Sequence, residues 1–87
     1  MTRISVRLRI EIEKELCNSV LKAIEPDNLS VPSGVSISTM CVDNMLYAEI
    51  RGDNVRVLTI RNTVDDLLEH ISIAYRCLKK VLSDRSL

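Results

Sequence analysis

The sequence predicts a small α+β domain of the order β-α-β-β-α, in which one three-stranded antiparallel sheet carries both helices on the same face. Three observations predict this fold class. Residues 4–12 alternate apolar and polar side chains, residues 13–25 and 55–82 repeat apolar side chains every three or four positions, and two short alternating stretches flank the dipeptide Asp43-Asn44. The chain of 87 residues shows no internal repeat, so we expect a single domain over residues 1–87.

The first two elements follow from a change of period. In residues 4–12 every second residue is Ile, Val or Leu, and the residues between them are Ser, Arg or Glu, which is typical of a strand that is buried on one face. The residues that follow instead place Leu16, Val20 and Ile24 on one side of a helix. Pro26 cannot continue that helix and is followed by a loop rich in turn residues.

The dipeptide Asp43-Asn44 fits the two-residue loop of a β-hairpin. If it forms that loop, residues that pair across the hairpin share the apolar face, so that register and hydrophobic pattern agree. The predicted inward-facing pairs are Cys41 with Leu46, Thr39 with Ala48, and Ile37 with Ile50. A strand-helix-strand connection makes the outer strands parallel, so the third strand is predicted to lie between the other two.

The same register places four apolar side chains together on the opposite face of the sheet. They are Met40, Val42, Met45 and Tyr47. Because they cluster near one turn, they form a patch rather than scattered exposure. We expect a self-association or subunit surface here; the alternative is the partly covered rim of a monomer.

The last helix, predicted over residues 55–82, is too long for the sheet. Its 28 residues would span about 42 Å, whereas an eight-residue strand covers about 27 Å, so the helix should overhang by roughly 15 Å. The apolar stripe nevertheless continues into the overhang, where a monomer would leave several side chains partly bare: Tyr75, Leu78, Val81 and Leu82. We expect a partner helix to pack against them, the alternative being a bend that returns the helix end to the sheet.

Composition argues against several classes of protein. Twelve Lys and Arg residues balance 12 Asp and Glu residues, so no long-range attraction for a polyanion is built in. No apolar run is long enough for a membrane span, and we expect no signal sequence and no membrane contact. Cys17, Cys41 and Cys77 form no CxxC pair, so we expect three reduced, mostly buried thiols and a reducing, cytoplasmic location.

The chain carries no recognisable motif for catalysis, for a cofactor or for a metal. His70 has no second His or Cys at ligand spacing, so it is expected to be an ordinary residue of a helix surface or a partner contact. Asp65 and Asp66 are neighbours on a helix and therefore point about 100° apart, which does not make a proton-sharing carboxylate pair. We expect no enzymatic activity, no cofactor and no metal in this chain alone.

Known nucleic-acid-binding modules do not fit either. Gly34 and Gly52 stand alone, so the GXXG loop of a KH domain is missing, and Tyr47 is the only aromatic residue on a predicted strand, too few for the stacking surface of an RRM. Two basic clusters remain: Arg3, Arg7 and Arg9 on the first strand, and Arg76, Lys79 and Lys80 near the C-terminus. An ordinary solvated surface explains them in the isolated domain, whereas within a larger assembly they would be available for phosphate contacts.

Two motifs resemble the family of small dimerisation subunits of the KEOPS tRNA-modification complex. Residues 24–28, IEPDN, are similar to the Leu-x-Pro-Asp-Asn stretch that follows the first helix of that family. Residues 60–68, IRNTVDDLL, resemble its Leu-Arg-Ala-Thr-hydrophobic-Asn-Ser-Leu-Leu run. The resemblance extends over residues 3–82, and in its short length the chain resembles the archaeal members. The chain departs from the family pattern toward negative charge at Asp65, Asp66 and Glu69, and carboxylates there argue against a tRNA contact.

The resemblance implies a non-catalytic scaffold. In that family the small subunit dimerises, with itself or with a paralogue, and its helices bind helices of the catalytic threonylcarbamoyltransferase subunit. The assembled complex makes threonylcarbamoyladenosine in tRNA, and the small subunit is implicated in holding the tRNA. The candidate residues here are Met40, Val42, Met45 and Tyr47 for the dimer interface, Arg61, Val64, Leu68, Tyr75 and Leu82 for the catalytic subunit, and Arg7, Arg9, Lys79 and Lys80 for tRNA.

Two functions of other classes stay open at this point. A free-standing α+β RNA-binding module would bind tRNA alone, with an affinity that falls steeply as salt rises. A homodimerisation domain of the kind appended to larger enzymes would associate without any role in RNA.

Overall fold

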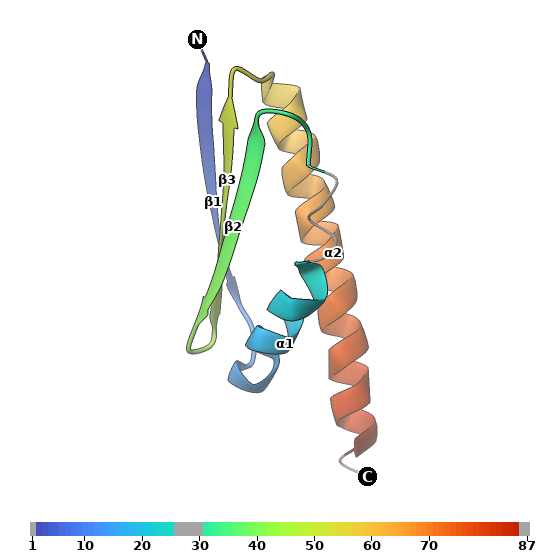
Figure 1. The fold of residues 1–87 in the computed structure, drawn as a ribbon. Coiled ribbons are helices and arrows are strands. Elements are labelled where there is room, and N and C mark those ends of the chain that lie inside the picture. The colour runs from blue at the N-terminus through green and yellow to red at the C-terminus, as the bar shows by residue number, and fades with distance from the viewer. Residues whose placement is uncertain (1, 26–30, 86–87) are drawn as a thin grey trace.

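Five elements follow one another in the predicted order. The computed structural model describes residues 2–25 and 31–85, with side chains as far as residue 81. The elements are β1 (Arg3–Glu11), α1 (Lys14–Ile24), β2 (Val35–Val42), β3 (Met45–Asp53) and α2 (Val57–Arg85). The order β-α-β-β-α confirms the predicted α+β class (Figure 1). Residues 26–28, which belong to the first family motif, lie outside the described residues.

The central position of β3 in the sheet is confirmed. The strand order is β1-β3-β2, and both neighbours run antiparallel to β3. All three predicted hairpin pairs are present: Cys41 with Leu46, Thr39 with Ala48, and Ile37 with Ile50. Asp43 turns the chain with a φ of 56°, a left-handed conformation that Asp adopts more readily than most residues. The hydrophobic pattern of the two strands therefore predicted their register correctly.

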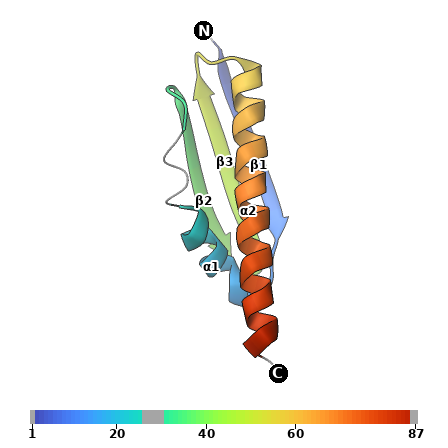
Figure 2. The same ribbon diagram turned by 90° about the vertical axis from the view of Figure 1, so that its right-hand side faces the viewer.

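Both helices cover the same face of the sheet, and the hydrophobic core lies between the two layers. Figure 2 shows α2 running along the sheet, with the shorter α1 beside its lower half on the β2 side. β3 supplies the centre of the core because its inward-facing residues are covered by both helices. The buried apolar residues are Ile12, Leu16, Cys17, Val20, Ile24, Leu46, Ala48, Ile50, Ile60, Leu67 and Ile71.

A glycine lets α2 start close to the sheet. A Cβ atom placed on Gly52 would lie 2.5 Å from Cγ2 of Val55 and 2.6 Å from Cδ1 of Ile60, distances at which atoms overlap. The chain therefore passes directly over β3 before the helix begins. The helix starts at Val57, two residues after the predicted start at Val55, because residues 54–56 are needed for the turn out of the sheet.

The end of α2 projects beyond the sheet, as its length predicts. The fold measures 55 × 22 × 17 Å, and Figure 1 shows the C-terminal turns of α2 extending past the β2–β3 hairpin. Tyr75 and Leu78 are half-buried and Val81 is 53% exposed, which confirms that the apolar stripe is partly bare. The side chain of Leu82 lies outside the described residues.

The expectation of three reduced, mostly buried thiols is wrong. Cys17 and Cys41 form a disulfide, with a Cα–Cα distance of 6.1 Å, and Cys77 is a free, exposed cysteine. The physical reason is the packing of α1 on the sheet: Cys17 lies on the inward side of the helix, and Cys41 lies on the inward face of β2. The argument from three free thiols to a reducing compartment therefore does not hold.

Candidate protein-interaction surfaces

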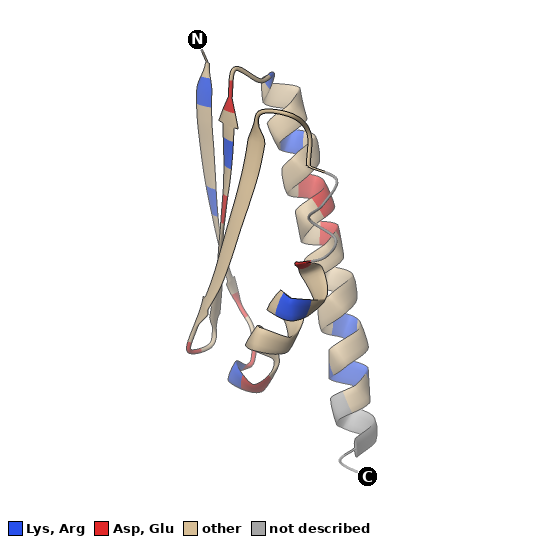
Figure 3. Ribbon diagram, in the orientation of Figure 1, with Lys and Arg blue, Asp and Glu red and all other residues tan. Residues whose placement is uncertain are grey.

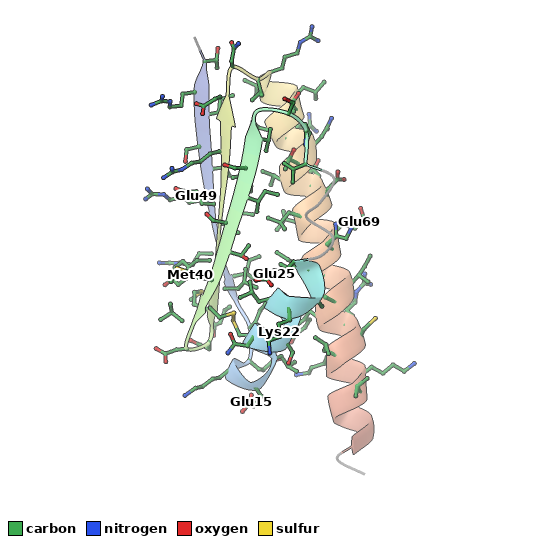
Figure 4. All side chains as sticks on the ribbon, in the orientation of Figure 1. Glu15, Lys22, Glu25, Met40, Glu49 and Glu69 are labelled. Atoms are coloured by element: carbon green, nitrogen blue, oxygen red, sulfur yellow. A yellow bond between two sulfur atoms is a disulfide. The ribbon has the colours of Figure 1, made fainter. Side chains whose placement is uncertain are left out.

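An apolar patch occupies the hairpin end of the outer sheet face, the face away from the helices. Its members are Met40, Val42, Met45 and Tyr47, and we call them the hairpin patch. Met40 is the Cα partner of Tyr47, and Val42 is the partner of Met45, so the four side chains form two adjacent cross-strand pairs. Met40, at 55%, is the most exposed of the four, and Figure 4 shows it on the side of the sheet opposite the helices. The predicted location of the patch is therefore confirmed.

Ion pairs lie toward the other end of the outer face. Arg7 Nε lies 3.0 Å from Oε2 of Glu49, and Arg51 Nε lies 3.0 Å from Oε1 of the same carboxylate. Arg3 Nε lies 3.1 Å from Oδ1 of Asp53. The hydrogen bond from Arg7 and the charge of Arg51 hold the pKa of Glu49 below its usual value. The outer face thus has an apolar patch near the hairpin and an ion-paired end, and only the apolar patch favours burial against a partner.

A second surface lies where the helix layer fails to cover β1. The inward-facing residues of β1 from Ile4 to Ile10 are half-buried, whereas those of β3 are buried. In Figure 2, α2 is the helix nearer to β1, and part of β1 is visible past α2 on the side away from α1. The resulting groove, which we call the β1–α2 groove, is lined by Ile10, Glu11, Ile12, Leu68, Ile71, Ser72 and Tyr75. It is mainly apolar, with one carboxylate at its rim.

A polar cluster closes the lower end of this groove. The hydroxyl of Tyr75 donates to Glu13, 2.7 Å from Oε1 and 2.9 Å from Oε2, and Lys79 Nζ lies 3.3 Å from Oε1. These contacts, the Tyr75 hydrogen bond most strongly, lower the pKa of Glu13, and they raise the pKa of Tyr75 and of Lys79. Glu13 precedes α1 at its N-cap position but makes no side-chain cap, because its carboxylate binds α2 instead.

The structure brings most of the predicted contacts for a catalytic subunit onto one side of α2. Leu68 and Tyr75 line the groove. Val64 is half-buried, and Arg61 is exposed about two helical turns before Leu68. Leu68, an apolar residue of this stripe, is 39% exposed. The fifth predicted residue, Leu82, has the helical spacing of this group, but its side chain lies outside the described residues. Four of the five residues are therefore placed along a single side of the helix.

The four candidate tRNA contacts do not share one face. Arg7 and Arg9 lie on the outer face of the sheet, whereas Lys79 and Lys80 lie near the end of α2 in the helix layer (Figure 3). Two of the four are engaged within the chain, because Arg7 pairs with Glu49 and Lys79 pairs with Glu13. The structure therefore provides two small basic regions rather than one continuous basic surface.

The residues considered for catalysis are ordinary parts of a helix surface. Asp65, Asp66 and Glu69 are exposed on α2 and form the acidic band that Figure 3 shows at mid-helix. His70 is exposed, and its Nδ1 donates to the carbonyl oxygen of Asp66 at 2.8 Å, a contact within one helical turn. Among the side chains of residues 2–25 and 31–81, no three from His, Cys, Asp or Glu converge as a metal site. In the part of the chain that the structure describes, no helix is long and apolar enough to cross a membrane.

Two features of these surfaces were missed in the sequence. Glu13 was treated only as the start of a helix, and no local pattern pairs it with Tyr75, 62 residues away. The disulfide did leave a signal, because Cys17 and Cys41 each occupy an apolar, inward-facing position on elements predicted to pack together. Reading those two positions jointly would have predicted the pair.

The family model described as "Transcription factor Pcc1" matches residues 5–79 of the chain. Among solved structures, one described as "Crystal structure of binary complex Gon7-Pcc1" matches with a TM-score of 0.74 and 18% sequence identity. That match covers 90% of this chain and 95% of the other. At this identity the likeness establishes the shared fold. A comparison with curated protein sequences finds no match.

Proposed function

Because this chain belongs to the Pcc1 family, whose members are small KEOPS subunits, we propose that it is a non-catalytic scaffold that dimerises and binds the catalytic threonylcarbamoyltransferase subunit. The observation that carries the proposal is the presence of two separate, partly bare apolar surfaces on a single small domain. The hairpin patch lies on the outer sheet face, and the β1–α2 groove lies in the helix layer. A chain with two such surfaces can bind two partners at once.

The hairpin patch is the proposed dimer interface. In a symmetric dimer the same patch is used by both chains, so each exposed side chain of the patch is buried once in each chain. Each apolar side chain that becomes fully buried contributes roughly 1.5–3 kcal/mol before the costs of association. Met40, Val42 and Tyr47 are all exposed in the single chain, so they have the most to gain. The ion pairs beside the patch then form its polar rim.

The β1–α2 groove is the proposed site for a helix of the catalytic subunit. A helix laid beside α2 would cover the half-buried residues of β1 and the exposed side of Leu68. Packing of this kind follows the ridges-into-grooves geometry of helix pairs. A dimer carries two such grooves, so it would recruit two catalytic subunits to one scaffold.

The partner at the hairpin patch can also be a paralogue instead of a second copy of this chain. The solved structure of similar fold is described as a binary complex of Gon7 with Pcc1, that is, a complex of two different proteins. In this protein the hairpin patch is equally able to accept a paralogue, because an apolar surface of this size carries little sequence specificity. The test below therefore measures self-association of the chain separately from its binding to the catalytic subunit.

We also infer a weak contribution to tRNA binding, in the cytoplasm where that substrate is found. The net charge of the chain is zero, and two of the four candidate cations are already ion-paired, which favours a supporting role over independent binding. Tight binding of tRNA by the isolated chain, with a steep loss of affinity as salt rises, would instead identify a free-standing RNA-binding module.

Light scattering on a size-exclusion column tests the scaffold. We expect a dimer for the chain alone and co-elution with the KEOPS catalytic subunit when the two are mixed. Met40→Glu should dissociate the dimer, because it places a charge in the hairpin patch. Ser36→Glu is the matched control, since it adds the same charge to the outer face of the same strand, opposite Arg51 and away from the patch.

A second pair of variants tests the groove. Leu68→Glu should lower the affinity for the catalytic subunit at least tenfold, so that co-elution is reduced, and should leave the dimer intact. Ile73→Glu is its control, because Ile73 is also an exposed apolar residue of α2 but lies about 140° further round the helix. A monomer that ignores the catalytic subunit, or equal effects of the two variants in each pair, would overturn the proposal.

A further inference from the structure

We propose that the Cys17–Cys41 disulfide is a redox-sensitive tie between the two interaction surfaces, and that the oxidised chain associates more tightly than the reduced chain. This inference rests on the proposed function, because it concerns the hairpin patch and the β1–α2 groove. It is carried by the position of the disulfide, which connects directly to a residue beside each surface.

The disulfide joins the helix layer to an edge of the sheet. Cys17 is 1% exposed on α1, and Cys41 is half-buried on the inner face of β2. β2 hydrogen-bonds to one strand, β3, so the disulfide gives this edge strand a second fixed point. Figure 4 shows the bonded sulfur atoms between the sheet and α1.

On the sheet side the tie leads to the hairpin patch. Cys41 lies between Met40 and Val42, whose side chains point to the opposite face of the strand. A shift of the backbone at Cys41 therefore moves both of these patch residues. In the oxidised chain that backbone is held by α1 as well as by β3.

On the helix side the tie leads to the β1–α2 groove. The backbone N–H of Cys17 donates to the carbonyl oxygen of Glu13 at 3.0 Å. The Glu13 carboxylate in turn accepts from the hydroxyl of Tyr75, which lines the groove. One helical turn thus connects the sulfur pair with the cluster that closes the lower end of the groove.

The expected direction follows from conformational entropy. A partner that binds a loosely held β2 or α1 must order it, and that ordering reduces the affinity. In the oxidised chain the ordering has already occurred on folding. Coupling between two sites in proteins typically changes affinity by 5- to 150-fold, and for one disulfide we expect the lower part of that range, about 5- to 20-fold.

The chemistry is thiol–disulfide exchange with a dithiol reductant. A thiolate of the reductant attacks Sγ of Cys41, the less buried partner; the Cys17–Cys41 bond breaks and Cys17 leaves as a thiolate. The second thiol of the reductant then attacks the reductant's first sulfur atom, which is bonded to Cys41 in the mixed disulfide, and Cys41 leaves as a thiolate. Two electrons pass to the protein, both cysteine thiolates take up protons, and the reductant becomes a cyclic disulfide.

The test compares oxidised and reduced protein in a Cys77→Ser background, which removes the exposed third thiol and with it any intermolecular disulfide. Sedimentation over a dilution series measures the homodimer Kd. We expect the Kd to rise about 5- to 20-fold on reduction with dithiothreitol and to return on reoxidation. Mass spectrometry should show a gain of two hydrogen atoms on reduction. Cys17→Ala with Cys41→Val, which keeps apolar side chains at both positions, should match the reduced Kd with or without dithiothreitol.

Each alternative outcome overturns a stated part. Equal Kd values for the oxidised chain, the reduced chain and the double variant would overturn the redox tie and leave the scaffold function intact. An oxidised chain that neither dimerises nor binds the catalytic subunit would overturn the scaffold function, and the tie with it. If circular dichroism shows that reduction unfolds the chain, the Kd of the folded double variant decides: a value equal to that of the oxidised chain overturns the tie.

Discussion

Breaking the disulfide should also lower the stability of the fold, apart from any effect on association. The bond joins residues 24 positions apart in sequence. Closing a loop of that length removes chain entropy from the unfolded state equivalent to about 3.5 kcal/mol at 25 °C. Disulfides typically contribute about 2–4 kcal/mol, so we expect a loss of about 2–3.5 kcal/mol in the free energy of unfolding.

Thermal unfolding of the Cys77→Ser protein, followed by circular dichroism with and without dithiothreitol, measures the loss. For a domain of this size each 1 kcal/mol shifts Tm by about 4–8 °C, so the reduced protein should melt about 8–28 °C lower. Because dimer formation makes Tm depend on concentration, the comparison is made at several protein concentrations. Cys17→Ala with Cys41→Val is the control and should show one Tm under both conditions.

A difference below about 2 °C between the oxidised and reduced proteins would refute this reasoning, because it corresponds to less than about 0.5 kcal/mol. Such a result would mean that the bond does not constrain the unfolded chain. A similar shift in the double variant, which has no bond to reduce, would show instead that dithiothreitol acts elsewhere.

Two further predictions concern packing and charge. Gly52→Ala should lower the free energy of unfolding by about 1–3 kcal/mol in urea titrations, because its Cβ would overlap Val55 and Ile60; an unchanged midpoint would contradict the packing of α2. The lowered pKa of Glu13 adds stability that is fully present above the ordinary glutamate pKa and is lost as pH falls through the folded value. Unfolding measured from pH 7 to pH 3 should therefore show a steeper acid loss in the native sequence than in Glu13→Gln, and parallel curves would contradict the Tyr75 contact.

Local periodicity predicted the fold because the decisive pairings are local. The hairpin register depends on a two-residue turn and on alternation over eight or nine residues on either side, and both are visible in the sequence. The central place of β3 then followed from the chain direction alone. The start of α2 was misplaced by two residues, since the turn after Gly52 depends on a close approach that no periodicity reports.

Contacts between distant residues set the limit for the candidate site. The hairpin patch was predicted from register, because exposure on a strand alternates. The Glu13–Tyr75–Lys79 cluster was not, because long side chains can reach several partners, and only the packed positions of α1 and α2 select one. For Lys79 the sequence suggested a cation available for tRNA, whereas in the fold Lys79 pairs with the carboxylate of Glu13.

The groove itself follows from the width of sheet that two helices can cover. α1 packs against β2 and β3, and α2 packs against β3. With α1 on the β2 side, α2 alone must cover the rest, and β1 keeps its inward residues half-buried. One more helix beside α2 would complete the layer, and this chain has no third helix in its described residues. The uncovered side of α2 is therefore where we propose that a helix of another chain packs.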